Sequence, residues 1–313
     1  MMSDKERNFI SAVIYVHNAE NRIKIFLRMI IRFLENNFEH SEIICVNDHS
    51  DDNSFQMIKD ISAAAETTSV SVLNMSYFHG VELAMSAGVD LSIGDFVFEF
   101  DNTVLDFEED MIMRVYKKSL QGYDIVSASP DGKERFSSSV FYKIFSCFTD
   151  LSYRMSTENF RVLSRRVINR IGSMNKTMLY RKAIYASSGL KTYNIKYVSN
   201  KGMTREKDKK EKDYRFGLAV DSLILFTEVG YKFSIAMTLI MMLMSIFVTI
   251  YTIIVYVTSH PVTGWTTTIL FLSVAFSGLF VILTIIIKYL QLLINLVFKR
   301  KQYSFESIEK LTK

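Results

Sequence analysis

Short apolar runs alternate with amphipathic stretches through the first hundred residues. The apolar runs predict β-strands at 10–16, 42–46, 69–74 and 95–100. Between them, apolar residues recur at helical spacing, which predicts helices at 21–37, 53–65 and 80–91. Because strands and helices alternate and the second strand is almost wholly apolar, we expect an α/β fold with a doubly wound, mostly parallel sheet.

The pattern changes after residue 106. It predicts a helix at 108–120 and a strand at 123–129, followed by a helix at about 137–154 with aromatic residues along one face. This last helix either packs on the core or lies in a membrane interface. A second amphipathic interface helix is expected at 214–229, leading into the C-terminal third. The charged stretch 201–215 predicts a solvated loop, or a basic loop that gathers lipid or substrate phosphates beside a membrane. The polar residues after Tyr303 predict a partly helical tail.

Two long runs without any charged residue dominate the C-terminal third, at 233–257 and 266–287. An apolar helix needs about 20 residues to cross a bilayer core, and both runs are long enough. We therefore expect a globular domain at 1–231, a two-helix transmembrane hairpin at 232–298 and a tail at 299–313.

Basic residues flank this hairpin on one side only. Lys232 precedes the first run, residues 299–301 follow the second, and the loop between the runs has no Lys or Arg. Since basic loops stay in the cytoplasm, we expect the domain and the tail to be cytoplasmic. The net charge of +4 is a mild surplus and does not favour nucleic acid as a partner.

Polar clusters follow three of the predicted strands, at 17–20, 47–54 and 101–106. Doubly wound sheets bind ligands at the carboxyl ends of their strands, so these clusters are the candidate site. None contains a glycine-rich phosphate loop, which argues against an ATPase or a dehydrogenase.

Four segments together resemble a known family. Residues 13–20 (VIYVHNAE), 46–52 (VNDHSDD), 80–95 and 159–166 (NFRVLSRR) are similar to successive motifs of the family 2 inverting glycosyltransferases of GT-A fold. Within that family, the chain resembles the polyprenol-phosphate glycosyltransferases and dolichol-phosphate mannose synthases, which carry C-terminal membrane helices. The resemblance covers nearly the whole chain.

The resemblance implies a nucleotide-sugar site at the strand ends. It assigns the donor to Val16, Asn18, Glu20, Asp48, Asp52, Gly80 and Asp101. An Asp48 carboxylate can accept a hydrogen bond from the imide of a uracil-type base. Asp101, with weaker support from Asp106, would hold Mg²⁺ or Mn²⁺, which prefer carboxylate oxygens.

The acceptor phosphate is assigned to basic residues. Arg161 is the first candidate, followed by Arg181 and Arg205, and Asp101 and Arg161 are the catalytic candidates. For Arg161 a purely structural ion pair is the alternative.

Three positions and one sequence element depart from the family pattern. Thr103 stands where the metal motif D-x-D has its second Asp, Tyr15 replaces a proline and Asn159 replaces an Asp. Asp106 or Glu99 could supply the missing carboxylate ligand of the metal. From strand alternation we expect Glu99 to be the poorer candidate. The glycine-serine/threonine-lysine element of the family is not recognisable in 201–215.

The expected function is transfer of a sugar from a nucleotide diphosphate, most simply a UDP-sugar, to undecaprenyl or another polyprenyl phosphate at the cytoplasmic face of a bacterial inner membrane. One alternative is a transferase that acts on a lipid-linked saccharide. Another is a catalytically silent sugar-nucleotide-binding or scaffolding paralogue, which the altered metal motif suggests. Small residues at 273, 275, 277 and 278 would permit homo-oligomers through close helix contacts.

Overall fold

The computed structural model describes residues 5–131, 158–173, 180–199 and 303–312, together with scattered helical positions between 214 and 293. In chain order its elements are β1 (Ile10–Val16), α1 (Glu20–Asn37), β2 (Ser41–Asn47), α2 (Ser54–Ser62), β3 (Ser69–Met75), α3 (Val81–Leu91), β4 (Phe96–Phe100), α4 (Asp110–Ser119), β5 (Ile125–Pro130), β6 (Phe160–Ser164), α6 (Arg165–Ser173), α7 (Arg181–Ser187), β7 (Thr192–Tyr197) and β8 (Phe305–Lys310). The strands and helices predicted between residues 10 and 129 are all present, with ends that move by a few residues.

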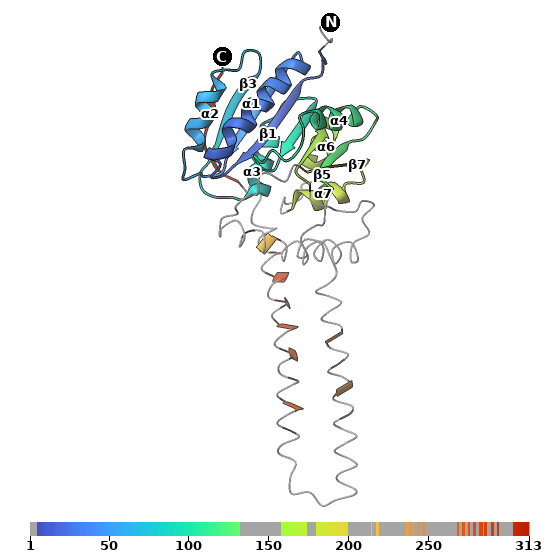
Figure 1. The fold of residues 1–313 in the computed structure, drawn as a ribbon. Helices are drawn as coiled ribbons and strands as arrows, with labels where there is room; N and C mark the ends of the chain where they lie inside the picture. Colours follow the sequence, from blue (N-terminus) through green and yellow to red (C-terminus); the bar gives the residue numbers. More distant parts are fainter. Residues whose placement is uncertain are drawn as a thin grey trace, which may run out of the picture. The chain divides into compact units, whose positions relative to one another are not determined.

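The eight strands form one sheet in the order β7-β5-β6-β4-β1-β2-β3-β8 (Figure 1). Strands β3, β2, β1 and β4 are parallel neighbours, as the alternating pattern predicted. Strand β6 runs antiparallel to both β4 and β5, and β8 runs antiparallel to β3. The sheet is therefore mixed, and its carboxyl-end edge at β1, β2 and β4 brings three polar loops together.

Strand β1 is buried on both faces, and its side chains belong to two separate hydrophobic cores. Alternate residues from Ile10 to Val16 pack against α1, α2 and α4, whereas Val13 and Tyr15 pack against α3 on the other face. Helix α3 approaches the sheet closely, because a Cβ atom on Gly88 would lie 2.5 Å from Val13 and 2.6 Å from Val46. The continuous apolar runs of the sequence follow from this burial on two faces.

The C-terminal tail corrects one prediction. Residues 305–310 form the edge strand β8 and not a partly helical tail. The strand is held by a hydrogen bond from Asn74 Nδ2 to Ser307 Oγ of 3.0 Å and by the ion pair of Lys59 with Glu309. The sequence pattern did not predict β8, because an edge strand whose side chains are mostly exposed shows no apolar alternation.

The chain divides into two compact units, residues 1–219 with 301–313, and residues 220–300. Among the described residues, none of the helices combines the length and the apolar character that crossing a bilayer requires. Most of 233–257 and 266–287, the whole helix predicted at 137–154, and Arg205 lie outside the described residues. The described positions 214, 217 and 218 of the helix predicted at 214–229 are helical.

Candidate active site

The loops that follow β1 and β2 are joined by reciprocal hydrogen bonds. Asn18 Oδ1 accepts from the Asp51 N–H at 2.9 Å, and Glu20 Oε2 accepts from the Asn53 N–H at 3.1 Å. In return, Asp52 Oδ2 accepts from the Glu20 N–H at 2.9 Å. Three residues predicted for the nucleotide therefore brace the site: Asn18, Glu20 and Asp52. Both loops lie at the edge where ligands of doubly wound sheets bind.

Asp48 is completely buried and holds a tight turn. Its Oδ1 accepts from the His79 N–H at 2.8 Å, and its Oδ2 accepts from the Gly80 N–H at 2.8 Å and from the Tyr15 hydroxyl at 2.9 Å. Burial raises the pKa of the Asp48 carboxyl, although these donors act to lower it. Val16, predicted to contact the nucleotide sugar, is buried in the core. Its carbonyl accepts a hydrogen bond from the Asp48 N–H at 2.9 Å.

Two further segments of the chain, at Tyr214 and Ser304, contact the turn at 79–80. Gly80 has φ +80°, and a Cβ atom there would lie 2.2 Å from the ring of Tyr214, so no other residue fits this position. The His79 ring donates from Nδ1 to the Tyr77 carbonyl at 2.5 Å and accepts at Nε2 from the Ser304 N–H at 3.1 Å. The segment that leads into β8 therefore supports the turn that Asp48 holds.

A ring of four charged side chains lies on the other side of α3. Arg161 donates to Glu99 Oε2 at 3.1 Å and to Asp101 Oδ2 at 2.7 Å. Arg181 donates to Glu99 Oε1 and to Asp101 Oδ1, both at 2.6 Å. Each arginine thus bridges the same two carboxylates, and the ring is closed. Strand pairing creates it in part, because Glu99 of β4 lies directly opposite Arg161 of β6.

Three more groups surround this ring. Glu82 of α3 accepts from Arg181 Nε at 3.0 Å, and the Tyr185 hydroxyl donates to Glu99 Oε1 at 2.9 Å. Glu158 lies 3.3 Å from Arg161 Nε, but that N–H makes no hydrogen bond of good geometry. Since α3 begins directly after Gly80 and carries Glu82, it connects the Asp48 turn to Arg181.

The two arginines are almost fully buried, with exposed fractions of 0% for Arg161 and 1% for Arg181. Burial alone would raise the pKa of Asp101, but the neighbouring Arg161 and Arg181 hold that pKa far below its usual range. Burial alone would lower the pKa of Arg161, and the carboxylates of Asp101 and Glu99 raise it instead. Asp101 and the two arginines are therefore charged at neutral pH. Arg161 thus forms buried ion pairs, and its role toward the acceptor phosphate stays a prediction.

Glu99 corrects a second expectation. Residues 99 and 101 are two positions apart along the chain, so a strand places their side chains on the same face. Accordingly, both contact Arg161 and Arg181. The sequence signal was present, since strand alternation favours Glu99 as a partner of Asp101. The roles of Glu82 and Tyr185 depend on contacts distant in sequence and had no local signal.

The residues expected to hold a divalent cation do not fit one in this arrangement. Both oxygens of Asp101 are bound to guanidinium groups, and the buried Thr103 has only a hydroxyl. Asp106 lies elsewhere, where it accepts from Asn159 Nδ2 at 2.6 Å and from the Tyr197 hydroxyl at 2.9 Å. In the described part of the chain, no three His, Cys, Asp or Glu side chains form a cluster that could hold a metal.

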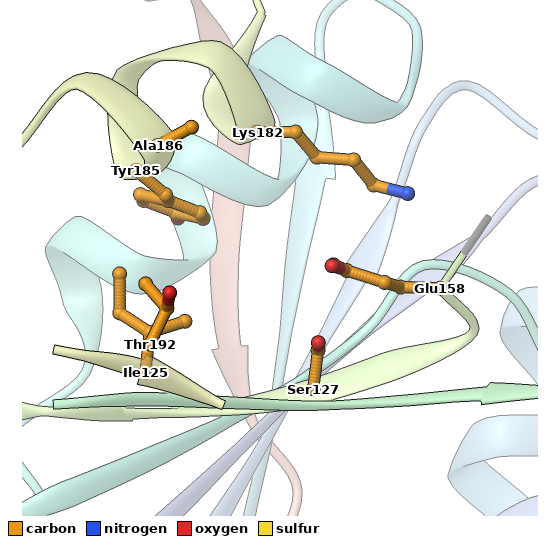
Figure 2. Close-up of a pocket in the computed structure, with 7 residues that line it drawn as sticks. All are labelled: Ile125, Ser127, Glu158, Lys182, Tyr185, Ala186 and Thr192. Atoms are coloured by element: carbon orange, nitrogen blue, oxygen red, sulfur yellow. The ribbon is translucent and has the colours of Figure 1, made fainter. Parts of the chain in front are cut away.

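A small cavity of about 20 Å³ lies beside Arg161, between α7 and the sheet (Figure 2). Lys182 and Tyr185 of α7 lie above Ser127 of β5, and the Lys182 ammonium points toward the Glu158 carboxylate. The volume of the cavity suits about one water molecule and is too small for a phosphate group. Two of the residues that line this cavity, Glu158 and Tyr185, also contact members of the ring.

Open α/β sheets bind their ligands at the carboxyl ends of their strands, and the carboxylates of Asp48 and Asp101 lie at that edge here. Residues 11–188 match the family described as Glycosyl transferase family 2, and the chain belongs to that family. The predicted membership of glycosyltransferase family 2 is confirmed, and the predicted enzyme class, a transferase, is confirmed as well.

Two curated relatives and one solved structure illustrate the similarity. An uncharacterized glycosyltransferase of Synechocystis sp. is 28% identical over 186 residues, which cover 58% of each chain. A prophage bactoprenol glucosyl transferase homolog of Escherichia coli is 31% identical over 195 residues, 60% of this chain and 63% of the relative. This chain therefore spans less than two thirds of either relative. Glucosyl-3-phosphoglycerate synthase from Mycobacterium tuberculosis, solved with Mn²⁺, UDP-glucose and phosphoglyceric acid, is 13% identical, with a TM-score of 0.48 over 69% of this chain and 78% of that one.

Proposed function

We propose that this protein transfers a sugar from a nucleotide diphosphate, most simply a UDP-sugar, to polyprenyl phosphate at the cytoplasmic face of a bacterial membrane. A phosphate oxygen of the lipid attacks the anomeric carbon, the bond from that carbon to the diphosphate oxygen breaks, and the nucleoside diphosphate leaves. Because the lipid phosphate is already ionised near neutral pH, no strong general base is needed. The chemistry depends on positioning the two substrates and on offsetting their charge.

The observation that carries the lipid acceptor is the pair of long uncharged runs joined to a family 2 domain in one chain. Helical positions within the first run support the same proposal, because Ile240, Leu243 and Phe247 have exposed fractions between 56% and 69%. Large apolar side chains exposed together mark a surface that is covered in the working protein. The name bactoprenol glucosyl transferase, carried by relatives, is in keeping with a lipid acceptor.

Chain connectivity supports a hairpin that both leaves and returns. Residues 301–313 belong to the same unit as residues 1–219, and β8 pairs with β3. If segment 220–300 enters a membrane, it must cross an even number of times, since both of its ends join one folded unit. The basic residues beside both runs would then place that unit in the cytoplasm.

Turnover in nanodiscs tests the proposal. Purified full-length protein would receive undecaprenyl phosphate and a series of UDP- and GDP-sugars, and lipid products would be identified by mass spectrometry. We expect one glycosylated lipid phosphate from one donor. As a matched pair, Asp101→Asn would lose most of this activity, and Asp60→Asn, on the exposed face of α2, would keep it. If product formed only with a lipid-linked saccharide, that saccharide and not polyprenyl phosphate would be the acceptor.

A catalytically silent paralogue is the second candidate, and the occupied Asp101 carboxylate favours it. If no sugar donor reacts with any acceptor while the folded protein still binds UDP in calorimetry, the protein is a catalytically silent sugar-nucleotide-binding paralogue and not a transferase.

A further inference from the structure

We propose that the site around Asp101 works without a divalent cation, because Arg161 and Arg181 together hold both oxygens of its carboxylate. This inference rests on the proposed function, since it concerns how the same site meets the charge of a nucleotide diphosphate. It departs from the expectation, drawn from family resemblance, that Asp101 binds Mg²⁺ or Mn²⁺.

The closed ring is the first reason. Arg161 and Arg181 each donate to Asp101 and to Glu99, with distances between 2.6 and 3.1 Å. Hydrogen bonds between two ionised groups are about twice as strong as those between neutral groups. A cation bound to Asp101 would break at least one of these bonds and would stand within a few ångström of a buried guanidinium, where repulsion is strong.

The second reason is the state of Thr103 and Asp106, the two positions at which a further metal ligand was considered. Thr103 lies two residues after Asp101 and is only 4% exposed, so it offers one buried hydroxyl. Asp106 is bound by Asn159 and Tyr197 in a separate group. Divalent Mg²⁺ and Mn²⁺ prefer several oxygen ligands, carboxylates above all.

The third reason is that the ring itself supplies permanent positive charge. Arginine cannot lose its proton in a protein, so Arg161 and Arg181 stay cationic at every relevant pH. Glu82 fixes Arg181 from α3, and Glu99 fixes both arginines from β4. Two guanidinium groups held in place can orient charge without a metal, since preorganised donors need no rearrangement during reaction.

Uptake of Mn²⁺ tests the inference without any assay of activity. Full-length protein in detergent would be titrated with Mn²⁺, alone and with UDP, and free Mn²⁺ would be followed by its electron paramagnetic resonance signal. We expect either no saturable uptake or uptake that Asp101→Asn leaves unchanged. One Mn²⁺ per chain that the wild type binds and Asp101→Asn does not would overturn the inference.

A gain-of-ligand variant sharpens this test. Thr103→Asp restores the second carboxylate of the D-x-D motif while Asp101 stays bound by both arginines. We expect this variant to take up no more Mn²⁺ than the wild type. A new saturable site would mean that Asp101 is available to a cation, and would overturn the inference. If neither variant folds, the wild type alone decides: no saturable uptake supports the inference, and one Mn²⁺ bound per chain overturns it.

Transfer assays separate this inference from the proposed function. We expect rates in EDTA within about two-fold of those in Mn²⁺, since no metal-dependent charge stabilisation would be lost. Transfer that requires Mn²⁺ or Mg²⁺ would overturn the inference and leave the proposed function standing. Transfer under no condition would remove the proposed function, and the Mn²⁺ titration would still decide the inference.

Discussion

Two buried carboxylates at the same edge of the sheet, Asp48 after β2 and Asp101 after β4, differ in the charge of their partners. Asp48 is bound by two backbone N–H groups and the Tyr15 hydroxyl, all of them neutral. Asp101 is bound by two guanidinium groups. Burial raises the pKa of Asp48, whereas for Asp101 the arginines outweigh burial and lower the pKa.

The difference shows that hydrogen bonds alone do not make a buried carboxylate easy to ionise. Three neutral donors satisfy the oxygens of Asp48 but do not offset its lost hydration, so its protonated form is relatively favoured. Two fixed positive charges do offset the lost hydration of Asp101. The Asp48 region is therefore a hydrogen-bonded turn, and the Asp101 region is a charged ring whose members depend on one another.

The largest expected effect comes from breaking the ring. Arg161→Met removes one of the two guanidinium groups that Glu99 and Asp101 share, and loss of one member of a buried ion pair costs about 3–5 kcal/mol. Urea unfolding of the detergent-solubilised protein, followed by circular dichroism, measures the loss. Arg32→Met is the matched control, because Arg32 pairs with Glu109 at the surface and its removal should cost less than about 1 kcal/mol. Equal losses in the two variants would show that the ring is not a stabilising unit.

A smaller loss is expected from neutralising Glu99 while keeping its shape. Glu99→Gln replaces charge-assisted bonds to both arginines by neutral ones and should lower the free energy of unfolding by about 2 kcal/mol. The same urea experiment measures it. Because Arg161 also contacts Glu99, the losses of Arg161→Met and Glu99→Gln should not add in the double variant. Strict additivity would contradict a closed ring.

Acid should weaken the Asp101 region. The folded pKa of Asp101 lies below its unfolded value of about 3.9, so its contribution is present above about pH 4 and fades as the pH falls toward the folded pKa. The difference in unfolding free energy between wild type and Asp101→Asn should shrink below pH 4, by at most about 1.4 kcal/mol per pH unit. For Asp48 the sign is opposite: a raised folded pKa favours the folded state as the pH falls. A difference for Asp101→Asn that stays constant from pH 7 to pH 3 would contradict the lowered pKa.

The smallest expected effect lies in the Asp48 region. Tyr15→Phe removes one of three neutral hydrogen bonds to Asp48 and should cost about 1 kcal/mol in urea unfolding. Since this bond acts to lower the pKa of Asp48, its removal should raise that pKa further. A loss as large as that of Arg161→Met would show that the two regions do not differ as their partners suggest.

Local sequence was sufficient for the core of the fold. Apolar runs at 10–16 and 42–46 became adjacent parallel strands because continuous burial leaves few other arrangements. The polar clusters after these strands met at one edge for the same reason, and Asp48 and Asp101 were found in this way. Strand β8 was missed because its side chains are largely exposed and its stability comes from pairing with β3.

The sequence by itself determined the class of the protein: an α/β domain of a glycosyltransferase family with carboxylates at its strand ends and two long apolar runs behind it. Only the tertiary structure decided what those carboxylates bind. Arg161 and Arg181 lie 60 and 80 residues from Asp101 along the chain, and they reach it through the pairing of β6 with β4 and the placement of α7. The charge state of a buried group depends on neighbours in space, and local patterns of hydrophobicity carry no record of them.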